Sequence, residues 1–359
     1  MKPLPSFVKA LVRSLPTAAL VCLTVPARAL EPQPPRPDPG GAQLKLVTTL
    51  GVLADLTRQV GGQWVQVDAL ARANQDPHYV EPTPVLMQRV RDADALVEVG
   101  LDLELWAEKV AAGSGNTRVQ PGQPGRVIAS KGVVALELPE VLSREWGDVH
   151  PYGNPHVWLD PLNARIIAGN IATVLADLDP EHASDYEANL AAFEKRIDES
   201  LFGAELVAKV GGKQLGRLAK SGRLQEYLEH RELTDLLGGW IAKAAPLKGR
   251  PVVTYHKTFI YLADRFGFHV PVEIEEKPGI PPSARHRNEV LELIQKQGVR
   301  TILEPPYYDR AAADYLSERS GARVVVAGID VGETVGVKDY FDMIDQLLDA
   351  LVRSETAAD

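Results

Sequence analysis

Cysteine is nearly absent from this chain of 359 residues: the only one is Cys22. It lies inside an N-terminal segment that we expect to be removed, so the mature protein should have no disulfide bond and no thiolate ligand. A metal site in this protein would therefore depend on nitrogen and oxygen donors. A lipid anchor on Cys22 is not expected, because Val21 directly before it is not a small residue.

Long hydrophobic runs are also missing. The longest candidate, Leu15–Val25, is too short to span a membrane, which needs roughly 20 apolar residues. Positive residues precede it and Ala27-Arg28-Ala29 follows it, as in a secretory signal peptide with an A-x-A cleavage site. We therefore predict a signal peptide at residues 1–29 and export of the mature chain to the periplasm.

An excess of positive charge is absent as well. The formal net charge is −9, which argues against a nucleic-acid partner and favours attraction of cations. The chain has no G-x-x-x-x-G-K-[ST] phosphate-binding loop, no H-E-x-x-H motif and no G-x-S-x-G motif. These absences remove the commonest signatures of nucleotide hydrolases, zinc proteases and serine hydrolases.

What the chain does have is an alternation of β-type and helical segments, typical of parallel sheets covered by helices. We predict an α/β fold with two lobes. The expected divisions are a Pro/Gly-rich flexible leader at 30–43, an N-terminal lobe at 44–178, a connecting helix at 179–210, a small basic helical insertion at 211–250 and a C-terminal lobe at 251–359. Predicted strands are 44–50, 64–70, 95–100, 126–130, 252–255, 270–274, 301–303 and 324–329.

Four residues that can bind a metal occur at strand ends or in the loops that follow. They are His78, His156, His256 and Asp330. In open α/β sheets, ligands bind at the carboxyl ends of the strands. Each residue has an ordinary alternative, such as an exposed loop histidine for His78, a hydrogen-bonded core histidine for His256, or a turn or helix-capping role for Asp330. Together, two from each lobe, they predict one metal ion held between the lobes.

Three imidazoles and one carboxylate match tetrahedral Zn²⁺ better than manganese or magnesium, which prefer carboxylate and water oxygens. Glu304, at the end of another predicted strand, is the second candidate carboxylate, and its most useful role would be to orient a histidine. His150 could be an accessory ligand, although an exposed loop position is the simpler interpretation. The remaining histidines in the chain are assigned no role.

Five stretches, in this order, resemble the metal-binding solute-binding proteins of zinc and manganese ABC importers, the cluster A-I type. They are D-P-H-Y-V-E-P, N-P-H-V-W-L-D-P, V-V-T-Y-H-K-T-F-I-Y-L-A-D-R-F-G, T-I-L-E-P-P-Y and V-A-G-I-D-V-G. The resemblance covers roughly 44–352, apart from 211–250. It implies two α/β lobes joined by a rigid long helix, with metal held by His78 and His156 from the first lobe and by His256 and Asp330 from the second.

Within that family, manganese members tend to have a carboxylate where His256 stands, so the resemblance implies a zinc-type member. The long His-rich loop that zinc members often carry is lacking, because only His150 and His156 occupy that region. The expected product is a monomeric, non-enzymatic protein that captures Zn²⁺ and delivers it to a membrane permease; a periplasmic metal chaperone is a second candidate partner. Three alternatives remain open: a manganese-specific member, a secreted zinc hydrolase using Glu304 or Asp330 as base, and an adhesin-like surface protein.

Overall fold

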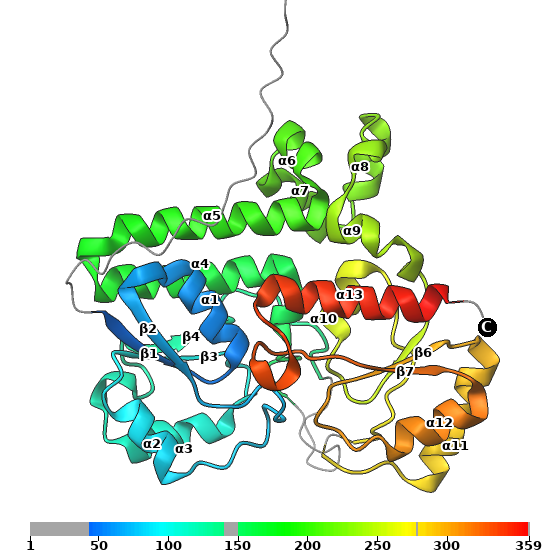
Figure 1. Ribbon diagram of the computed structural model, residues 1–359, viewed down its shortest axis with the longest axis horizontal. Helices are drawn as coiled ribbons and strands as arrows, with labels where there is room; N and C mark the ends of the chain where they lie inside the picture. Colours follow the sequence, from blue (N-terminus) through cyan, green and yellow to red (C-terminus); the bar gives the residue numbers. More distant parts are fainter. Residues whose placement is uncertain (1–42, 140–149, 278, 358–359) are drawn as a thin grey trace, which may run out of the picture. The chain divides into compact units, whose positions relative to one another are not determined.

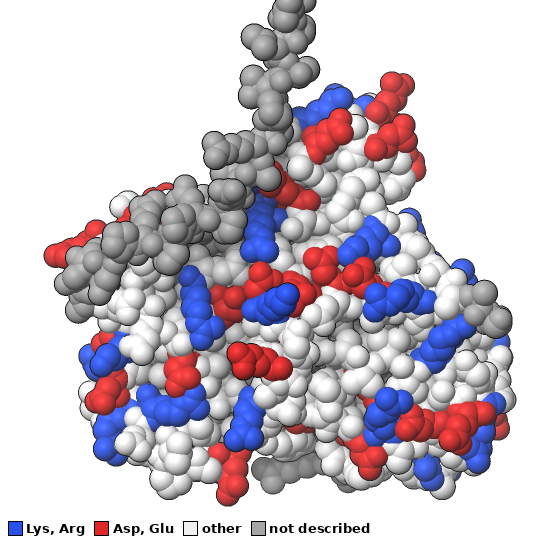
Figure 2. All heavy atoms as spheres, viewed as in Figure 1, with Lys and Arg blue, Asp and Glu red and all other residues white. Residues whose placement is uncertain are grey.

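The computed structural model describes residues 43–139, 150–277 and 279–357. The predicted signal peptide, and all of the predicted leader except its last residue, lie outside these ranges. Residues Gly40–Asp359 form one compact unit. Within its described part, no helix has the length and apolarity needed to cross a membrane. On the face drawn in Figure 2, basic and acidic side chains are interspersed.

The first sheet contains four parallel strands in the order β2-β1-β3-β4. Helices α1 and α4 pack on one side of this sheet, and α2 and α3 pack against each other below it (Figure 1). The central strand β1 places Leu46 opposite Val67 of β2 and Ala95 of β3, and Leu46 is buried. The bounds are β1 Leu44–Thr48, β2 Val65–Ala69, β3 Ala95–Glu98, β4 Arg126–Ile128, α1 Gly51–Gly61, α2 Pro84–Arg91, α3 Leu105–Ser114 and α4 Pro161–Leu178.

The second sheet contains three parallel strands in the order β5-β6-β7. Its two faces are both buried: Val252 joins the large core shared with α13, whereas Val253 joins a smaller core with residues of α11 and α12. This explains why β5 is a continuous apolar run in the sequence, as expected for a strand covered on both faces. The bounds are β5 Val252–Thr254, β6 Thr301–Glu304, β7 Arg323–Val326, α10 Ile260–Phe266, α11 Ala284–Gln297, α12 Ala311–Ser320 and α13 Tyr340–Thr356.

The strand predicted at 270–274 does not form. This segment runs beside β5 through isolated bridges only, Pro251 with His269 and Thr254 with Glu273. Pro271 has no N–H to donate to a ladder, which explains why the pairing is interrupted. The segment still continues alongside β5, because the Glu275 N–H donates to the Tyr255 carbonyl at 2.8 Å.

The connecting helix is shorter than the sequence predicts. Helix α5 covers Ala183–Phe202 and α6 covers Ala204–Val210, with a break at Gly203 instead of one helix through 179–210. Gly203 has a φ of +89°, and a Cβ there would lie 2.9 Å from the Cα of Gly238, so a glycine is required at this close approach. Helix α5 runs along α4 (Figure 1), contacts α1, and reaches α13 through Phe193 and Phe341, whose ring centroids are 5.7 Å apart.

The segment predicted as a helical insertion does consist of short helices, α7 (Gly212–Lys220), α8 (Leu224–His230) and α9 (Gly239–Lys243). It follows α6 and leads into β5 through a short 3₁₀ turn at Ala245–Leu247. Helix α7 packs on α5, and the buried Trp240 of α9 donates to Asp345 of α13 at 3.1 Å. This segment is therefore packed against both the connecting helix and the last helix.

The two sheets are tied together by buried polar contacts close to the strand ends. Trp158 donates its indole N–H to the Ile329 carbonyl at 2.7 Å, and Tyr340 donates to the Trp158 carbonyl at 2.7 Å. Arg265 of α10 binds both oxygens of Asp160 at 2.8 Å. Asp160 also caps α4, as its position before Pro161 predicts. These contacts hold the segment before α4 against the second sheet.

Candidate metal centre

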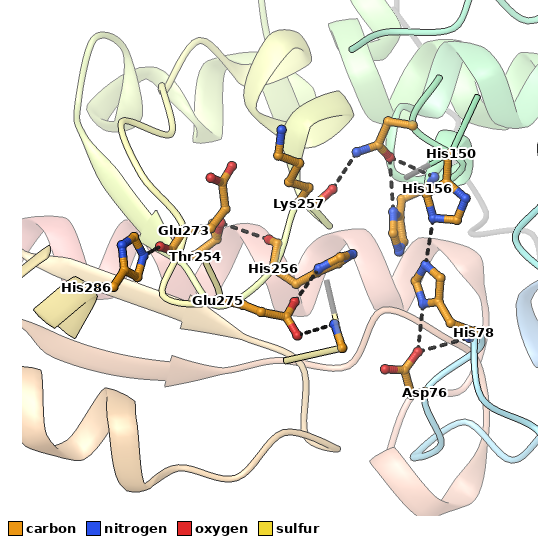
Figure 3. Close-up of polar contacts among 12 residues, drawn as sticks. Asp76, His78, His150, His156, Thr254, His256, Lys257, Glu273, Glu275 and His286 are labelled. Atoms are coloured by element: carbon orange, nitrogen blue, oxygen red, sulfur yellow. Dashed lines mark hydrogen bonds and ion pairs between the residues drawn. The ribbon is translucent and has the colours of Figure 1, made fainter. Parts of the chain in front are cut away.

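Three of the four histidines and carboxylates predicted as ligands meet at one point. The ligand atoms of His78, His156 and His256 all lie within 4.8 Å of one another. His78 is in the loop after β2, His156 directly precedes the turn into α4, and His256 is in the turn between β5 and α10 (Figure 3). His156 and His256 are buried, and His78 is half-buried.

His78 is oriented by Asp76. Asp76 Oδ1 accepts a hydrogen bond from His78 Nδ1 at 2.7 Å and from the His78 backbone N–H at 3.0 Å. Burial, which raises the pKa of Asp76, is outweighed by these bonds and by the charge of His78, so that pKa is lowered overall. Trp106 of α3 donates to the Pro77 carbonyl at 2.8 Å, which holds the backbone directly before His78.

His156 is oriented by Asn154. The Asn154 Oδ1 accepts from His156 Nδ1 at 3.0 Å and from the His156 backbone N–H at 3.0 Å, while its amide nitrogen donates to the Lys257 carbonyl at 2.5 Å. Burial, reinforced by the neighbouring histidines, lowers the pKa of His156 well below its usual range, so the imidazole is neutral near pH 7. His156 Nε2 is buried and has no hydrogen-bond partner in the described part of the chain.

His256 is oriented by Glu275, a residue that the sequence analysis did not single out. Glu275 Oε2 lies 2.6 Å from His256 Nδ1, and Oε1 accepts from the Gly279 N–H at 2.7 Å. In the sequence, the feature that could have pointed to Glu275 is a carboxylate at the end of a mainly apolar segment that comes after β5. Glu275 is buried, and it reaches His256 because residues 270–275 run alongside β5.

The three imidazoles therefore share one arrangement. Each Nδ1 faces an oxygen acceptor, Asp76, Asn154 or Glu275, so that each Nδ1 carries the proton and each Nε2 keeps its lone pair. This is the tautomer in which histidine binds a metal through Nε2, with an outer oxygen that fixes the ring. Donors of this type suit a divalent cation with a preference for nitrogen.

Asp330, the fourth predicted ligand, occupies a different position. Its carboxylate lies outside the three-histidine group and receives backbone N–H groups, from Val52 at 2.5 Å, Val331 at 2.9 Å and Gly51 at 3.1 Å. Gly51 and Val52 begin α1 in the other lobe, so Asp330 caps that helix from across the molecule. Burial raises the pKa of Asp330 to about 6 despite these three bonds. The two carboxylate oxygens together offer four lone pairs, and three accept these bonds. The fourth, on Oδ2, remains for another partner.

Glu304 does not orient a histidine in this structure. It is fully buried at the end of β6, and neither of its carboxylate oxygens has a hydrogen-bond partner among the described residues. Burial raises the pKa of Glu304 to about 7. The positioning role that the sequence suggested for Glu304 is filled for His256 by Glu275.

His150 lies beside the cluster, not in a freely exposed loop. Its Nε2 is 3.1 Å from His78 Nε2, and the two ring centroids are 5.1 Å apart (Figure 3). The other histidines lie elsewhere: His182 stacks on Trp64 at 3.6 Å, and His286 contacts the Glu273 carbonyl. The described cluster thus contains three mutually close imidazoles and a fourth that touches one of them.

Comparison with known proteins shows the family to which the chain belongs. The sequence profile of the family described as "Zinc-uptake complex component A periplasmic" matches residues 46–201 and 223–354. The chain belongs to this family. It is thus a member of the metal-binding substrate-binding proteins of ABC importers, as the sequence motifs predict. The profile leaves out residues 202–222, which contain α6 and α7, and not the whole of 211–250 that the motifs leave out; α8 and α9 lie within the matched part.

Relatives of the chain are named for different metals. The chain is 24% identical over 324 residues to the iron-binding protein YfeA of Yersinia pestis, with 88% of each chain covered. It is 31% identical over 161 residues to the manganese ABC transporter substrate-binding lipoprotein PsaA of Streptococcus pneumoniae, which covers 44% of this chain and 49% of that protein. Membership therefore establishes binding of a metal cation and leaves its identity open.

A solved structure described as a 138-173 deletion mutant of ZnuA with zinc bound has the same fold. The TM-score is 0.65 with 22% sequence identity, covering 88% of this chain and all of that one. The similarity confirms the predicted α/β architecture with two parallel sheets.

Proposed function

We propose that the protein is a periplasmic high-affinity zinc-binding protein that captures Zn²⁺ between its lobes and delivers it to an ABC-type permease. The proposed ligands are His78, His156 and His256, with Asp330 as the oxygen donor. Asp330 would use the lone pair that its three backbone bonds leave. The captured zinc is cargo, and the protein acts as a monomer without catalysis.

One observation carries this proposal: the buried Nε2 of His156 has no hydrogen-bond partner among the residues that the structure describes, and its ring lies beside two other imidazoles. A buried polar atom without a partner costs about 1–3 kcal/mol. Because the pKa of His156 is lowered, this Nε2 does not take up a proton near pH 7 and keeps its lone pair. A cation bound by all three Nε2 atoms would supply the missing interaction for each of them.

The donor set favours zinc over the other metals in the family. Three neutral imidazoles suit zinc, whereas manganese prefers carboxylate and water oxygens. Manganese remains the alternative cargo, because a manganese-named relative is 31% identical over 161 residues of the chain. A zinc hydrolase is disfavoured by the surroundings of the two bases considered for it. Asp330 accepts from three backbone N–H groups, and within the described ranges neither carboxylate oxygen of Glu304 has a hydrogen-bond partner.

Transport requires a partner that accepts the cation. Family membership supports an ABC permease in the inner membrane, since a relative is named as the substrate-binding part of such a transporter. A periplasmic metal chaperone that loads the protein is a further proposed partner.

The first test is the metal content of the purified mature protein, with competitive titration of Zn²⁺ against Mn²⁺. We expect one zinc per chain with a preference over manganese. His256→Ala should weaken zinc binding by at least about 100-fold, more than the loss of an outer-shell partner would cause. His230→Ala, at the exposed end of α8, is the matched control and should bind as the wild type does.

The outcomes separate the alternatives. Preference for manganese in the wild type would move the function to manganese uptake. Zinc affinity unchanged in His256→Ala would remove His256 from the ligand set. A wild-type protein that holds neither metal tightly would contradict the whole proposal.

A further inference from the structure

His150 is the nearest group outside the three-histidine cluster. Its Nε2 contacts His78 Nε2 at 3.1 Å, and the dashed line between the two rings in Figure 3 continues the line from Asp76 to His78. His150 begins a turn that leads to Asn154 and His156. The turn is closed by the Gly153 N–H, which donates to the His150 carbonyl. His150 is half-buried, so it stands between solvent and the buried imidazoles.

The contact between the two nitrogens is chemically unusual. Asp76 accepts the Nδ1 proton of His78, so His78 presents a lone pair at Nε2. A second Nε2 can approach that lone pair at 3.1 Å if it carries a proton, or if both nitrogens face one cation. Two nitrogens bound to one Zn²⁺ at ~2.0–2.1 Å would lie about 2.9 Å apart at a right angle and about 3.3 Å apart at the tetrahedral angle. The observed spacing falls between these values.

We propose that His150 is an additional nitrogen ligand of the captured cation, bound from the solvent side next to His78. This inference rests on the proposed function and extends its ligand set to four imidazoles and the Asp330 carboxylate. His150 is outside the group whose atoms are mutually within 4.8 Å, so its ring must move toward His156 and His256 when the cation binds. Its proximity to His78 makes that movement short.

The consequence is selectivity. A fourth imidazole makes the site nitrogen-dominated, which strengthens zinc binding far more than manganese binding. As a fifth donor it also fills the solvent side of the cation and keeps water from binding there. His150 would therefore act as a determinant of metal choice.

The test compares His150→Ala and His150→Asp with the wild type, using competitive titration of Zn²⁺ and Mn²⁺ and X-ray absorption of the zinc-bound protein. His150→Ala should weaken zinc binding by at least about tenfold, lower the zinc-to-manganese preference, and reduce the number of imidazoles seen at zinc by one. His150→Asp should shift the preference further toward manganese, because it replaces nitrogen with oxygen. His230→Ala is the control.

Other results would overturn the inference. If His150→Ala binds zinc as the wild type does, His150 is not a ligand. If it binds zinc more tightly, His150 only occupies the His78 lone pair in the metal-free protein and competes with the cation. In both cases His78→Ala should still lose tight zinc binding, which would leave the proposed function intact. If wild type and His78→Ala both fail to bind zinc, the proposed function itself fails.

Discussion

At the scale of single residues, the candidate site depends on three oxygens that do not touch the cation. Asp76, Asn154 and Glu275 each accept from one histidine Nδ1, and each is tied to the backbone as well. A ligand ring with a fixed tautomer and orientation loses less freedom when the cation binds. The acceptors are therefore as much a part of the site as the histidines.

Glu275 tests this point directly. Glu275→Gln keeps the shape of the side chain but removes its charge, so His256 becomes a less basic and less firmly oriented ligand. We expect zinc affinity to fall by roughly 10- to 100-fold with the stoichiometry unchanged, measured by competition with a chelator.

The matched control is Glu276→Gln, because Glu276 is the next residue and is exposed. It should bind zinc like the wild type. Equal affinities in Glu275→Gln and Glu276→Gln would show that the 2.6 Å contact with His256 does not contribute to binding.

Glu304 gives a prediction about stability and pH. Burial raises the pKa of its carboxyl from the usual 4.5 to about 7, so the folded state holds a proton that the unfolded chain releases. Its contribution to stability is complete below pH 4.5 and is lost as the pH rises through about 7. Glu304→Gln cannot ionise, so its free energy of unfolding should increase relative to wild type by roughly 2–3 kcal/mol between pH 5 and pH 8.

The measurement is denaturant unfolding at several pH values, with a chelator present to keep the protein free of metal. Glu318→Gln, on the exposed face of α12, should show no such trend. A constant difference between Glu304→Gln and wild type at all pH values would mean that Glu304 is ionised in the folded protein.

The sequence predicts the histidines of the site better than their partners. His78, His156 and His256 stand out because each follows a strand or a proline at a point where α/β folds bind ligands. His150 is recognised only as a possible accessory ligand, and Glu275 is not selected at all, because its role depends on the distance between segments far apart in the chain. The position of Asp330 on α1 likewise depends on the packing of one lobe against the other.

At the scale of helices and strands, most predictions hold where periodicity alone decides. β1, β5 and β6 lie where the apolar pattern places them. The two failures have local causes: Pro271 interrupts pairing beside β5, and Gly203 ends the connecting helix because it packs against Gly238. Pro271 is visible in the sequence, whereas the break at Gly203 depends on a tertiary contact with Gly238.

At the scale of the whole molecule, the candidate site lies where the two lobes are already bonded. His78 and His156 come from the first lobe and His256 from the second, and Asp330 of the second lobe caps α1 of the first. A cation held by these residues adds a further link between lobes that are tied by Trp158, Tyr340 and Arg265. Binding should therefore stabilise the entire fold.

Thermal unfolding with and without zinc measures that link. Zinc at about 100 times its Kd should stabilise the wild type by about 2.7 kcal/mol and raise Tm by several degrees, and a chelator should reverse the shift.

Asp330→Ala separates the two roles of the carboxylate. Loss of the cap on α1 should lower the stability of the metal-free protein by about 0.5–2 kcal/mol. Loss of the oxygen donor should reduce the zinc-induced rise in Tm at the same zinc concentration. A lower metal-free Tm with a full zinc-induced rise would limit Asp330 to joining the lobes, and leave the cation to the imidazoles alone.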